Sequence, residues 1–373
     1  MIYLDYSANT PVDQAVLERF CQLEQRYTGN PNSDHAAGRE AKQKMDAITA
    51  GIADALQVLP EKIIYTSGAS EANNLAIKGI AHTGRHIGKH IISTPLEHSS
   101  VSGALTALQE RGYEIDLLDI RRDGTIDPEH LRELLRRDTV LVAVCAVDSE
   151  LGTVQPIQEI ARIVKDFPDC RLHVDATQAV GKIPVSFDGV DTMSFAPHKF
   201  YGLNGSGILL KRKGVILEPL IHGGASTTIY RSGTPALALA GAVEQALTLA
   251  LAQLSDRLEV VQKWNTLLRT ELAKYERVRI NSPQHSVPHI LNISVAGVRG
   301  TDFQQALDRH GICVSVKSAC SVPNTPSRAV FAVSRDRKQA MSSWRISLSH
   351  LTTQEEIHAF LSAFDLCYKE LTL

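Results

Sequence analysis

The chain has 373 residues and a formal net charge of −2, from 39 lysines and arginines against 41 aspartates and glutamates. At about 100–200 residues per domain, this length predicts two domains. The composition, 43% hydrophobic and 21% charged, is ordinary for a folded protein and excludes a disordered, collagen-like or membrane-spanning chain. The balanced charge gives no overall attraction for nucleic acid or an anionic membrane, so we expect neither as a partner.

The sequence also predicts the cellular location of the protein. It begins without a basic segment followed by a long apolar one, so no secretory signal is expected. The apolar stretch from Pro235 to Leu254 contains Glu244 and Gln245, which favours a buried helix over a membrane span. The six cysteines include no C-x-x-C pair, so we expect neither a disulfide framework nor a metal site, and a cytoplasmic location fits best.

Short β-branched runs alternate with helical patterns between residues 63 and 210. Strands are predicted at 63–65, 91–92, 115–118, 140–147, 172–174 and 192–195, and helices at 70–81, 99–111, 128–137 and 156–166. This alternation predicts a parallel sheet covered by helices on both faces. The run 140–147 is continuously apolar, as expected of a strand buried on both sides.

The segments on either side of this region complete the predicted fold. Met45, Ile48, Ile52 and Leu56 recur at helical spacing ahead of the sheet. After the buried helix predicted between Pro235 and Leu254, strands are predicted at 278–280, 290–295 and 312–316, and helices at 302–309 and 354–371. We therefore predict an α/β fold with a large domain over 16–252 and a smaller α+β domain formed by 1–15 and 253–373.

Ligands of open α/β sheets lie beyond the carboxyl ends of the strands, so the loops there are the candidates for a binding site. The loop 66–71 joins a strand to a helix through Gly68 and hydroxyl residues, which suits an anion, although any capped loop of this kind looks alike. Asp175 ends a buried strand, where its carboxylate needs a cation or a donor. An ordinary helix-capping aspartate is the alternative interpretation.

Two further strand ends carry basic side chains. Lys199 follows the strand 192–195 in apolar surroundings, which lower the pKa of a lysine and prepare its amine for Schiff-base chemistry. His98 follows the strand 91–92, where a structural buried histidine is the alternative. An anion site, a buried acid, a reactive lysine and an imidazole at one sheet edge are what pyridoxal 5'-phosphate requires.

These motifs make the chain similar to a known family. It resembles the cysteine desulfurases, which are class V, fold type I pyridoxal-phosphate enzymes that supply sulfur for iron–sulfur clusters and thiolated tRNA. The resemblance rests on motifs that keep the family's order along nearly the whole chain, at 3–8, 29–31, 66–71, 97–98, 150–152, 175–178, 198–199, 231–234, 318–320 and 345–347. It implies a fold type I architecture with a mostly parallel central sheet.

The resemblance assigns cofactor contacts to individual residues. It implies that Lys199 bonds to the cofactor, that Asp175 pairs with the ring nitrogen and that Gln178 hydrogen-bonds the ring oxygen. His98 would stack on the ring and move protons. The residues implied to hold the phosphate are Ala69, Ser70, His198 and, from the partner subunit of a homodimer, Thr234.

The resemblance also implies the reaction. Arg345 would bind the carboxylate of L-cysteine, and Cys320 would attack its sulfur, leaving L-alanine and a persulfide that passes to a sulfur-acceptor protein. Cys320 lies near Pro323 and Pro326, which predicts an irregular segment, and Lys317 nearby could lower the pKa of the thiol. An inert loop cysteine is the alternative.

The chain departs from the family pattern at several positions. Asp148-Ser149-Glu150 replaces the usual Asn-Asn-Glu, and Asp148 is expected beside both the ring oxygen and the substrate carboxylate, which its charge would repel. Ala196 and Pro197 replace a Ser-Gly pair, and 225–228 lacks the usual glutamate. Two alternatives therefore stay open: a related lyase or aminotransferase for another small amino acid, and a non-catalytic sulfur-relay partner.

Overall fold

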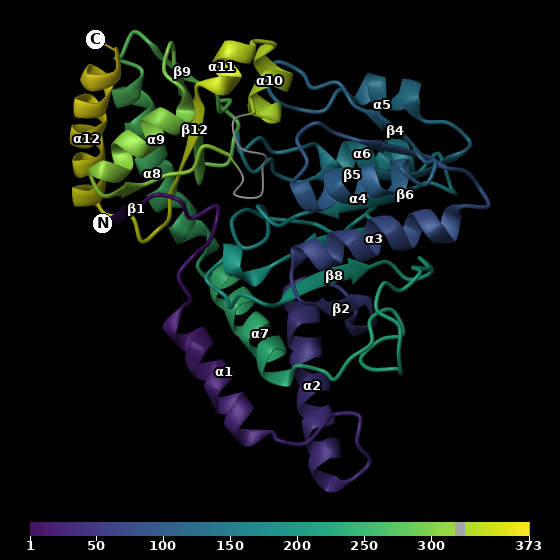
Figure 1. Ribbon diagram of the computed structural model, residues 1–373. Coiled ribbons are helices and arrows are strands. Elements are labelled where there is room, and N and C mark those ends of the chain that lie inside the picture. The colour runs from purple at the N-terminus through teal and green to yellow at the C-terminus, as the bar shows by residue number, and fades with distance from the viewer. Residues whose placement is uncertain (318–324, 373) are drawn as a thin grey trace.

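The computed structural model describes residues 1–317 and 325–372. Figure 1 shows a larger lobe built on a wide sheet and a smaller lobe that contains β12, α9 and α12 and holds both ends of the chain. Helices α1 and α2 extend from the larger lobe, side by side with α7.

The larger lobe is built on a seven-stranded sheet with the order β2-β8-β7-β6-β5-β3-β4. Its strands are β2 (Ile63–Thr66), β3 (His90–Ser93), β4 (Glu114–Leu117), β5 (Thr139–Cys145), β6 (Arg171–Asp175), β7 (Thr192–Phe195) and β8 (Gly207–Lys211). Strand β8 runs antiparallel to both of its neighbours, β2 and β7, and the other pairs of this sheet are parallel. The predicted strands and their mostly parallel arrangement are confirmed.

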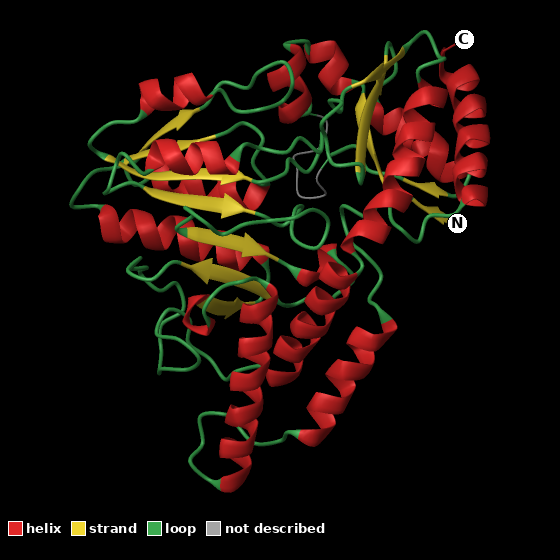
Figure 2. Ribbon diagram, turned by 180° about the vertical axis from the view of Figure 1, so that it is seen from behind, coloured by secondary structure: helices red, strands yellow, loops and turns green. Residues whose placement is uncertain are grey.

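Helices cover both faces of this sheet, as Figure 2 shows. The helices of the larger lobe are α1 (Gln14–Arg26), α2 (Ala36–Ala55), α3 (Ala69–Gly84), α4 (Ser99–Gln109), α5 (Pro128–Leu134), α6 (Ile157–Val164) and α7 (Leu237–Ala252), with short 3₁₀ helices η1 (Pro60–Lys62) and η2 (Pro197–Lys199). The central strand β5 explains the two layers. Its alternate residues Val142 and Val144 join one hydrophobic cluster, and Leu141 and Ala143 join the other.

The smaller lobe contains an antiparallel sheet with the order β12-β10-β9 and a parallel pair, β1 with β11. Its strands are β1 (Ile2–Tyr3), β9 (Val278–Ile280), β10 (Ile290–Val295), β11 (Ile312–Cys313) and β12 (Ser343–Ser347), and its helices are α8 (Leu254–Leu272), α9 (Gly300–Arg309), α10 (Arg328–Ser334), α11 (Arg337–Met341) and α12 (Gln354–Thr372). The predicted strand 312–316 is too long, because only its first two residues pair with β1.

The smaller lobe has its own aromatic core. Trp344 stacks on Phe303 with the ring centroids 5.1 Å apart, and Phe364 packs against both. We propose the domain division 16–252 against 1–15 plus 253–373 on the basis of this separate cluster. Among the described residues no single helix is long and apolar enough to span a membrane; α7 and α8 reach that length only together, and they meet at 66°.

Candidate active site

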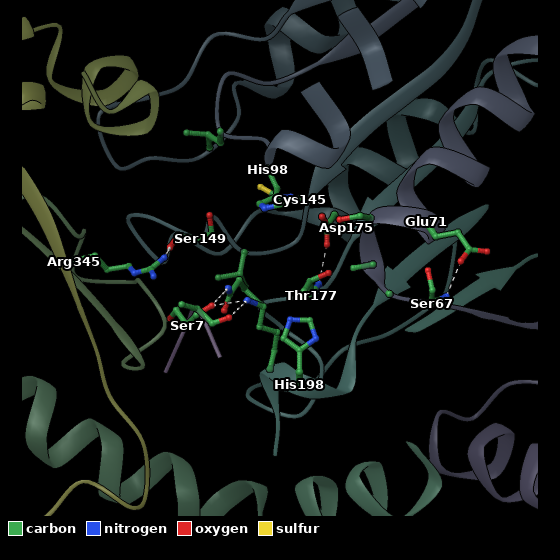
Figure 3. Close-up of a pocket in the computed structure, with 18 residues that line it drawn as sticks. Ser7, Ser67, Glu71, His98, Cys145, Ser149, Asp175, Thr177, His198 and Arg345 are labelled. Carbon is green, nitrogen blue, oxygen red and sulfur yellow. Dashed lines mark hydrogen bonds between the residues drawn. The ribbon is translucent and has the colours of Figure 1, made fainter. Parts of the chain in front are cut away.

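A cavity of about 390 Å³ lies at the carboxyl ends of β6 and β7 and reaches the smaller lobe (Figure 3). Most of the residues singled out in the sequence line it, and these are Ala69, Ser70, His98, Asp175, Gln178, His198, Lys199 and Arg345. In Figure 3, Arg345 enters from one side and Ser67 and Glu71 lie on the other. The volume of the cavity falls in the range of small-molecule and cofactor sites.

The loop between β2 and α3 forms one wall of the cavity. Helix α3 begins at Ala69, so its first backbone N–H groups are available to an anion at the helix N-terminus. Strand β8 approaches this loop closely at Gly207, where a Cβ would lie 2.5 Å from the carbonyl carbon of Gly68. Only glycine at position 207 therefore allows the loop to sit against β8.

Glu71 braces the same loop. One of its oxygens accepts a hydrogen bond from the Ser67 N–H at 2.7 Å, and the other pairs with Arg231 at 2.9 Å. Burial raises the pKa of Glu71, but the hydrogen bonds from Arg231 and Ser67 outweigh it, and the net pKa is lowered. The carboxylate is thus charged and ties the loop to the segment that carries Arg231.

The Asp175 carboxylate is fixed by two donors. Oδ2 accepts a hydrogen bond from Nδ2 of Asn73 at 2.8 Å, and Oδ1 accepts one from the N–H of Thr177 at 3.0 Å. Asn73, fully buried on α3, accepts in turn from His173 at 3.0 Å and from Ser194. This network sets the carboxylate at the end of β6 in one orientation.

His98 caps the start of α4. Its Nδ1 accepts a hydrogen bond from the N–H of Ser100 at 3.1 Å, so the ring carries its proton on Nε2. Burial lowers the pKa of His98; Lys199 and Arg328 act in the same direction and Asp175 opposes them. The imidazole is therefore neutral at neutral pH.

Lys199 ends η2, directly after β7. Its Nζ donates to the carbonyl oxygens of Ser7 at 2.9 Å and Ala8 at 2.6 Å. His198 beside it has a pKa of about 4, lowered by burial and then by the neighbouring lysines Lys199 and Lys182. Among the described residues that line the cavity, Lys199 is the only lysine.

Arg345 reaches the cavity from β12 in the smaller lobe and is 2% exposed. One terminal nitrogen pairs with Asp5 at 2.8 Å, and the other donates to the carbonyl oxygen of Ser149 at 2.6 Å. Its Nε is buried without a hydrogen-bond partner among the described residues. The guanidinium is thus held in place with a donor still to be satisfied.

Asp148 does not take the position expected from the sequence. It does not line the cavity; its Oδ2 accepts a hydrogen bond from the N–H of Leu151, so the side chain closes its own turn. The nearby guanidinium of Arg345 pairs with Asp5 rather than with Asp148. The backbone of the turn, with Gly152 at φ 76°, directs the carboxylate inward.

Two other expected residues lie outside this cavity. Thr234 lines a separate hollow of about 150 Å³ together with Ser67 and Arg231. Cys320 lies outside the described residues. Lys317 and Thr325, at either end of that segment, are joined by hydrogen bonds of 2.8 Å and 2.7 Å from Nζ to the Thr325 carbonyl and hydroxyl oxygens.

Sequence reasoning missed several residues that hold the site together. Asn73 orients Asp175, Asp5 pairs with Arg345, and the carbonyl groups of Ser7 and Ala8 bind Lys199. Asn73 could have been found as a polar residue on the apolar face of a predicted helix. The segment 3–8 appears among the family motifs, but a sequence motif does not show which side chains its carbonyl groups face.

Comparison with known proteins gives the family. The model of the class-V aminotransferases matches residues 2–360. The chain belongs to this family. It is 36% identical to a protein named cysteine desulfurase IscS from Dictyoglomus turgidum, over 99% of this chain and 95% of that protein. It is also 36% identical to a NifS/IcsS protein homolog from Lactobacillus delbrueckii subsp. bulgaricus, over 100% and 98%.

Solved structures agree with this assignment. A NifS-like protein superposes with a TM-score of 0.93 at 34% identity, covering 99% of this chain and all of the other. A structure titled "SspA in complex with cysteine" superposes with a TM-score of 0.82 at 29% identity, covering 95% and 100%. The fold type I architecture expected from the resemblance is confirmed, and so is the family.

The cofactor of this family is pyridoxal phosphate, and the cavity fits it. The hydroxyl oxygens of Ser7 and Thr177 are buried without a hydrogen-bond partner in the part of the chain that is described, and both residues line the cavity. Such groups are available to hydrogen-bond a polar ligand in the cavity. An oriented carboxylate, a lysine amine and a helix N-terminus surround the same space, which matches the polar ends of the cofactor.

Proposed function

We propose that this protein is a pyridoxal-phosphate-dependent cysteine desulfurase. It converts L-cysteine to L-alanine and passes the sulfur, as a persulfide on Cys320, to an acceptor protein. One observation carries the proposal: a single cavity brings together Lys199, Asp175, His98 and Arg345 in a chain that matches proteins named cysteine desulfurase over its whole length.

The cavity supplies a group for each polar end of the cofactor. When bound, pyridoxal phosphate withdraws electrons from the substrate carbon next to the amine. Lys199 would bond to it, Asp175 would pair with the ring nitrogen and Gln178 would donate to the ring oxygen. The phosphate would rest on the first N–H groups of α3, at Ala69 and Ser70, near His198, which lines the same cavity.

The substrate would be oriented by Arg345. A guanidinium binds a carboxylate through two parallel hydrogen bonds, and Arg345 has an unsatisfied Nε beside a nitrogen that Asp5 now occupies. His98, neutral because of its burial, would move protons at the ring once Nδ1 gives up its hydrogen bond from the Ser100 N–H. Arg345 would thus bind the substrate, and His98 would transfer protons.

The sulfur transfer balances without an added oxidant. The Cys320 thiolate would attack the substrate sulfur, so that an S–S bond forms while the bond between sulfur and the substrate β-carbon breaks. The β-carbon keeps the electron pair and takes up a proton, which gives alanine. Cys320 is oxidised to the persulfide while the carbon is reduced.

The test mixes purified holoenzyme with L-cysteine and a thiol reductant and measures alanine and sulfide together. We expect equal amounts of both. Lys199→Ala should lose the borohydride-reducible cofactor adduct and all turnover. Cys320→Ser should bind cofactor and L-cysteine but form no persulfide, because a hydroxyl is a far weaker nucleophile toward sulfur than a thiolate.

Other outcomes would contradict the proposal. Normal turnover by Cys320→Ser would move the chemistry to another thiol or another reaction. Alanine without persulfide in the wild type would favour a related lyase or aminotransferase. A colourless purified protein that binds no cofactor would favour the non-catalytic relay. Asp148, the residue on which the lyase alternative rests, is not among the residues that line the cavity.

The proposal also covers the oligomeric state, the location and the sulfur acceptor of the protein. We propose a homodimer in which the partner subunit's Thr234 reaches the phosphate, since Thr234 does not line the cavity of its own chain. Light scattering should give twice the chain mass of 40.8 kDa. A reducing cytoplasmic location, with an iron–sulfur or tRNA-thiolation protein as acceptor, suits a reaction that needs a free thiol; the described cysteines form no disulfide.

A further inference from the structure

Lys182 is a buried lysine for which the mechanism above has no role. It lies in the segment that follows β6, directly after Gly181, which has a φ of 75°. Only 7% of the surface of Lys182 is exposed. Its Nζ donates to Oε1 of Gln178 at 2.6 Å. Lysines are almost never this buried unless they are paired, so the contact with Gln178 needs a reason.

The contact decides which way the Gln178 amide faces. Nε2 of Gln178 donates to the carbonyl oxygen of Ser7 at 2.9 Å, and that oxygen also accepts from Lys199. A carbonyl oxygen can only accept, so the Ser7 carbonyl requires Nε2 of Gln178 on its side. Oε1 of Gln178 then faces Lys182, whose amine can donate to it in either protonation state.

The surroundings of Lys182 connect it with the cavity. Burial lowers the pKa of Lys182 well below its ordinary value, and the charges of Lys199 and Arg345 lower it further. Lys182 in turn contributes to the low pKa of His198 in the cavity wall, behind the effects of burial and Lys199. His289, just before β10 in the smaller lobe, has a pKa of about 3 through burial and then through Lys182.

We propose that Lys182 is a positioning residue of the cofactor site. It holds the Gln178 amide with its oxygen turned away and its N–H toward Ser7 and the cavity, so that an anionic ring oxygen meets a donor. The reverse orientation would set the amide oxygen against that anion. This inference rests on the cofactor-binding arrangement proposed above.

The test uses two lysines that are equally buried. Lys182→Met removes the donor and keeps most of the side-chain volume, whereas Lys211→Met removes a lysine that is also 7% exposed but donates to the Val215 carbonyl, away from the cavity. Titration of each apoprotein with pyridoxal phosphate should show at least a tenfold rise in Kd for Lys182→Met. Lys211→Met should stay within twofold of the wild type.

A double-mutant cycle separates positioning from a general structural role. If Lys182 acts through Gln178, Lys182→Met should add no further loss of cofactor affinity in a Gln178→Leu background. The visible absorption maximum of the bound cofactor should shift in the same direction in both single variants. If Lys182→Met does not fold, as judged by its melting curve, Lys182→Gln, which keeps an N–H donor, takes its place and should bind more tightly than Gln178→Leu.

An unchanged Kd in Lys182→Met, or an equal loss in both backgrounds, would overturn the inference. These measurements need no L-cysteine. The positioning role can therefore hold even if the protein proves inactive as a desulfurase, and it can fail while the desulfurase activity is confirmed.

Discussion

The buried carboxyl group of Asp148 should make the stability of the protein depend on pH. Asp148 is fully buried, and its burial, followed by the charge of Glu150, raises its pKa from about 3.8 to about 7. Between these values the folded state keeps a proton that the unfolded chain has lost. The free energy of unfolding therefore falls as the pH rises through this window, by about 1.4 kcal/mol per pH unit.

Asp148→Asn removes the titration and keeps the shape. The amide oxygen can still accept from the Leu151 N–H, while its NH₂ group takes the place of Oδ1, which has no partner among the described residues. Any cost of burying that NH₂ is the same at every pH. From pH 5 to pH 8 the variant should gain about 3 kcal/mol on the wild type, since about two units of the window lie above pH 5.

Urea unfolding of the holoprotein at pH 5 and pH 8, at equal protein concentration, measures this gain. The exposed Asp166→Asn is the control and should give the same difference from the wild type at both pH values. A pH-independent difference for Asp148→Asn would refute the reasoning. Because Asp148 does not line the cavity, the KM of Asp148→Asn for L-cysteine should stay within twofold of the wild-type value. A tenfold fall in KM would instead show that Asp148 contacts the substrate.

Three further predictions follow from close contacts at the site. Gly207→Ala should raise the Kd for pyridoxal phosphate at least tenfold, because its Cβ would press on Gly68, whereas Gly103→Ala, with open space around its Cβ, should not. Asn73→Leu should lower the free energy of unfolding by about 2–3 kcal/mol in urea, because it leaves several buried polar partners unpaired; an unchanged midpoint would contradict this. Asp5→Asn should lower the KM for L-cysteine in steady-state assays, because it removes an anion that competes for the Arg345 guanidinium; a raised KM would show that Asp5 orients Arg345 productively.

The sequence was most informative where one physical rule acts alone. A strand buried on both faces must be apolar throughout, and β5 was found that way; all seven of its residues are buried. Strand ends gather at one sheet edge, which brought Asp175 and Lys199 to one cavity. The antiparallel direction of β8 was beyond this reasoning, because periodicity does not depend on the direction in which a strand runs.

The sequence was least informative where backbone geometry turns a side chain. The family resemblance placed Asp148 beside the cofactor, but the turn that ends at Gly152 points its carboxylate at the Leu151 N–H instead. Asn73 and Asp175 are 102 residues apart, so no local pattern joins them. The tertiary fold brings these two residues together, because α3 packs against β6.

The N-terminal segment is hydrogen-bonded to residues of both lobes at the site. The N–H of Ser347 on β12 donates to the Leu4 carbonyl at 2.7 Å, and the N–H of Ser7 donates to the hydroxyl of Ser347 at 2.9 Å, which ties this segment to the smaller lobe. The carbonyl of Ser7 meanwhile accepts from Lys199 of the larger lobe. The same segment presents Asp5 to Arg345. Residues 5–8 therefore contact both the arginine that enters the cavity from the smaller lobe and the lysine that lines it in the larger lobe.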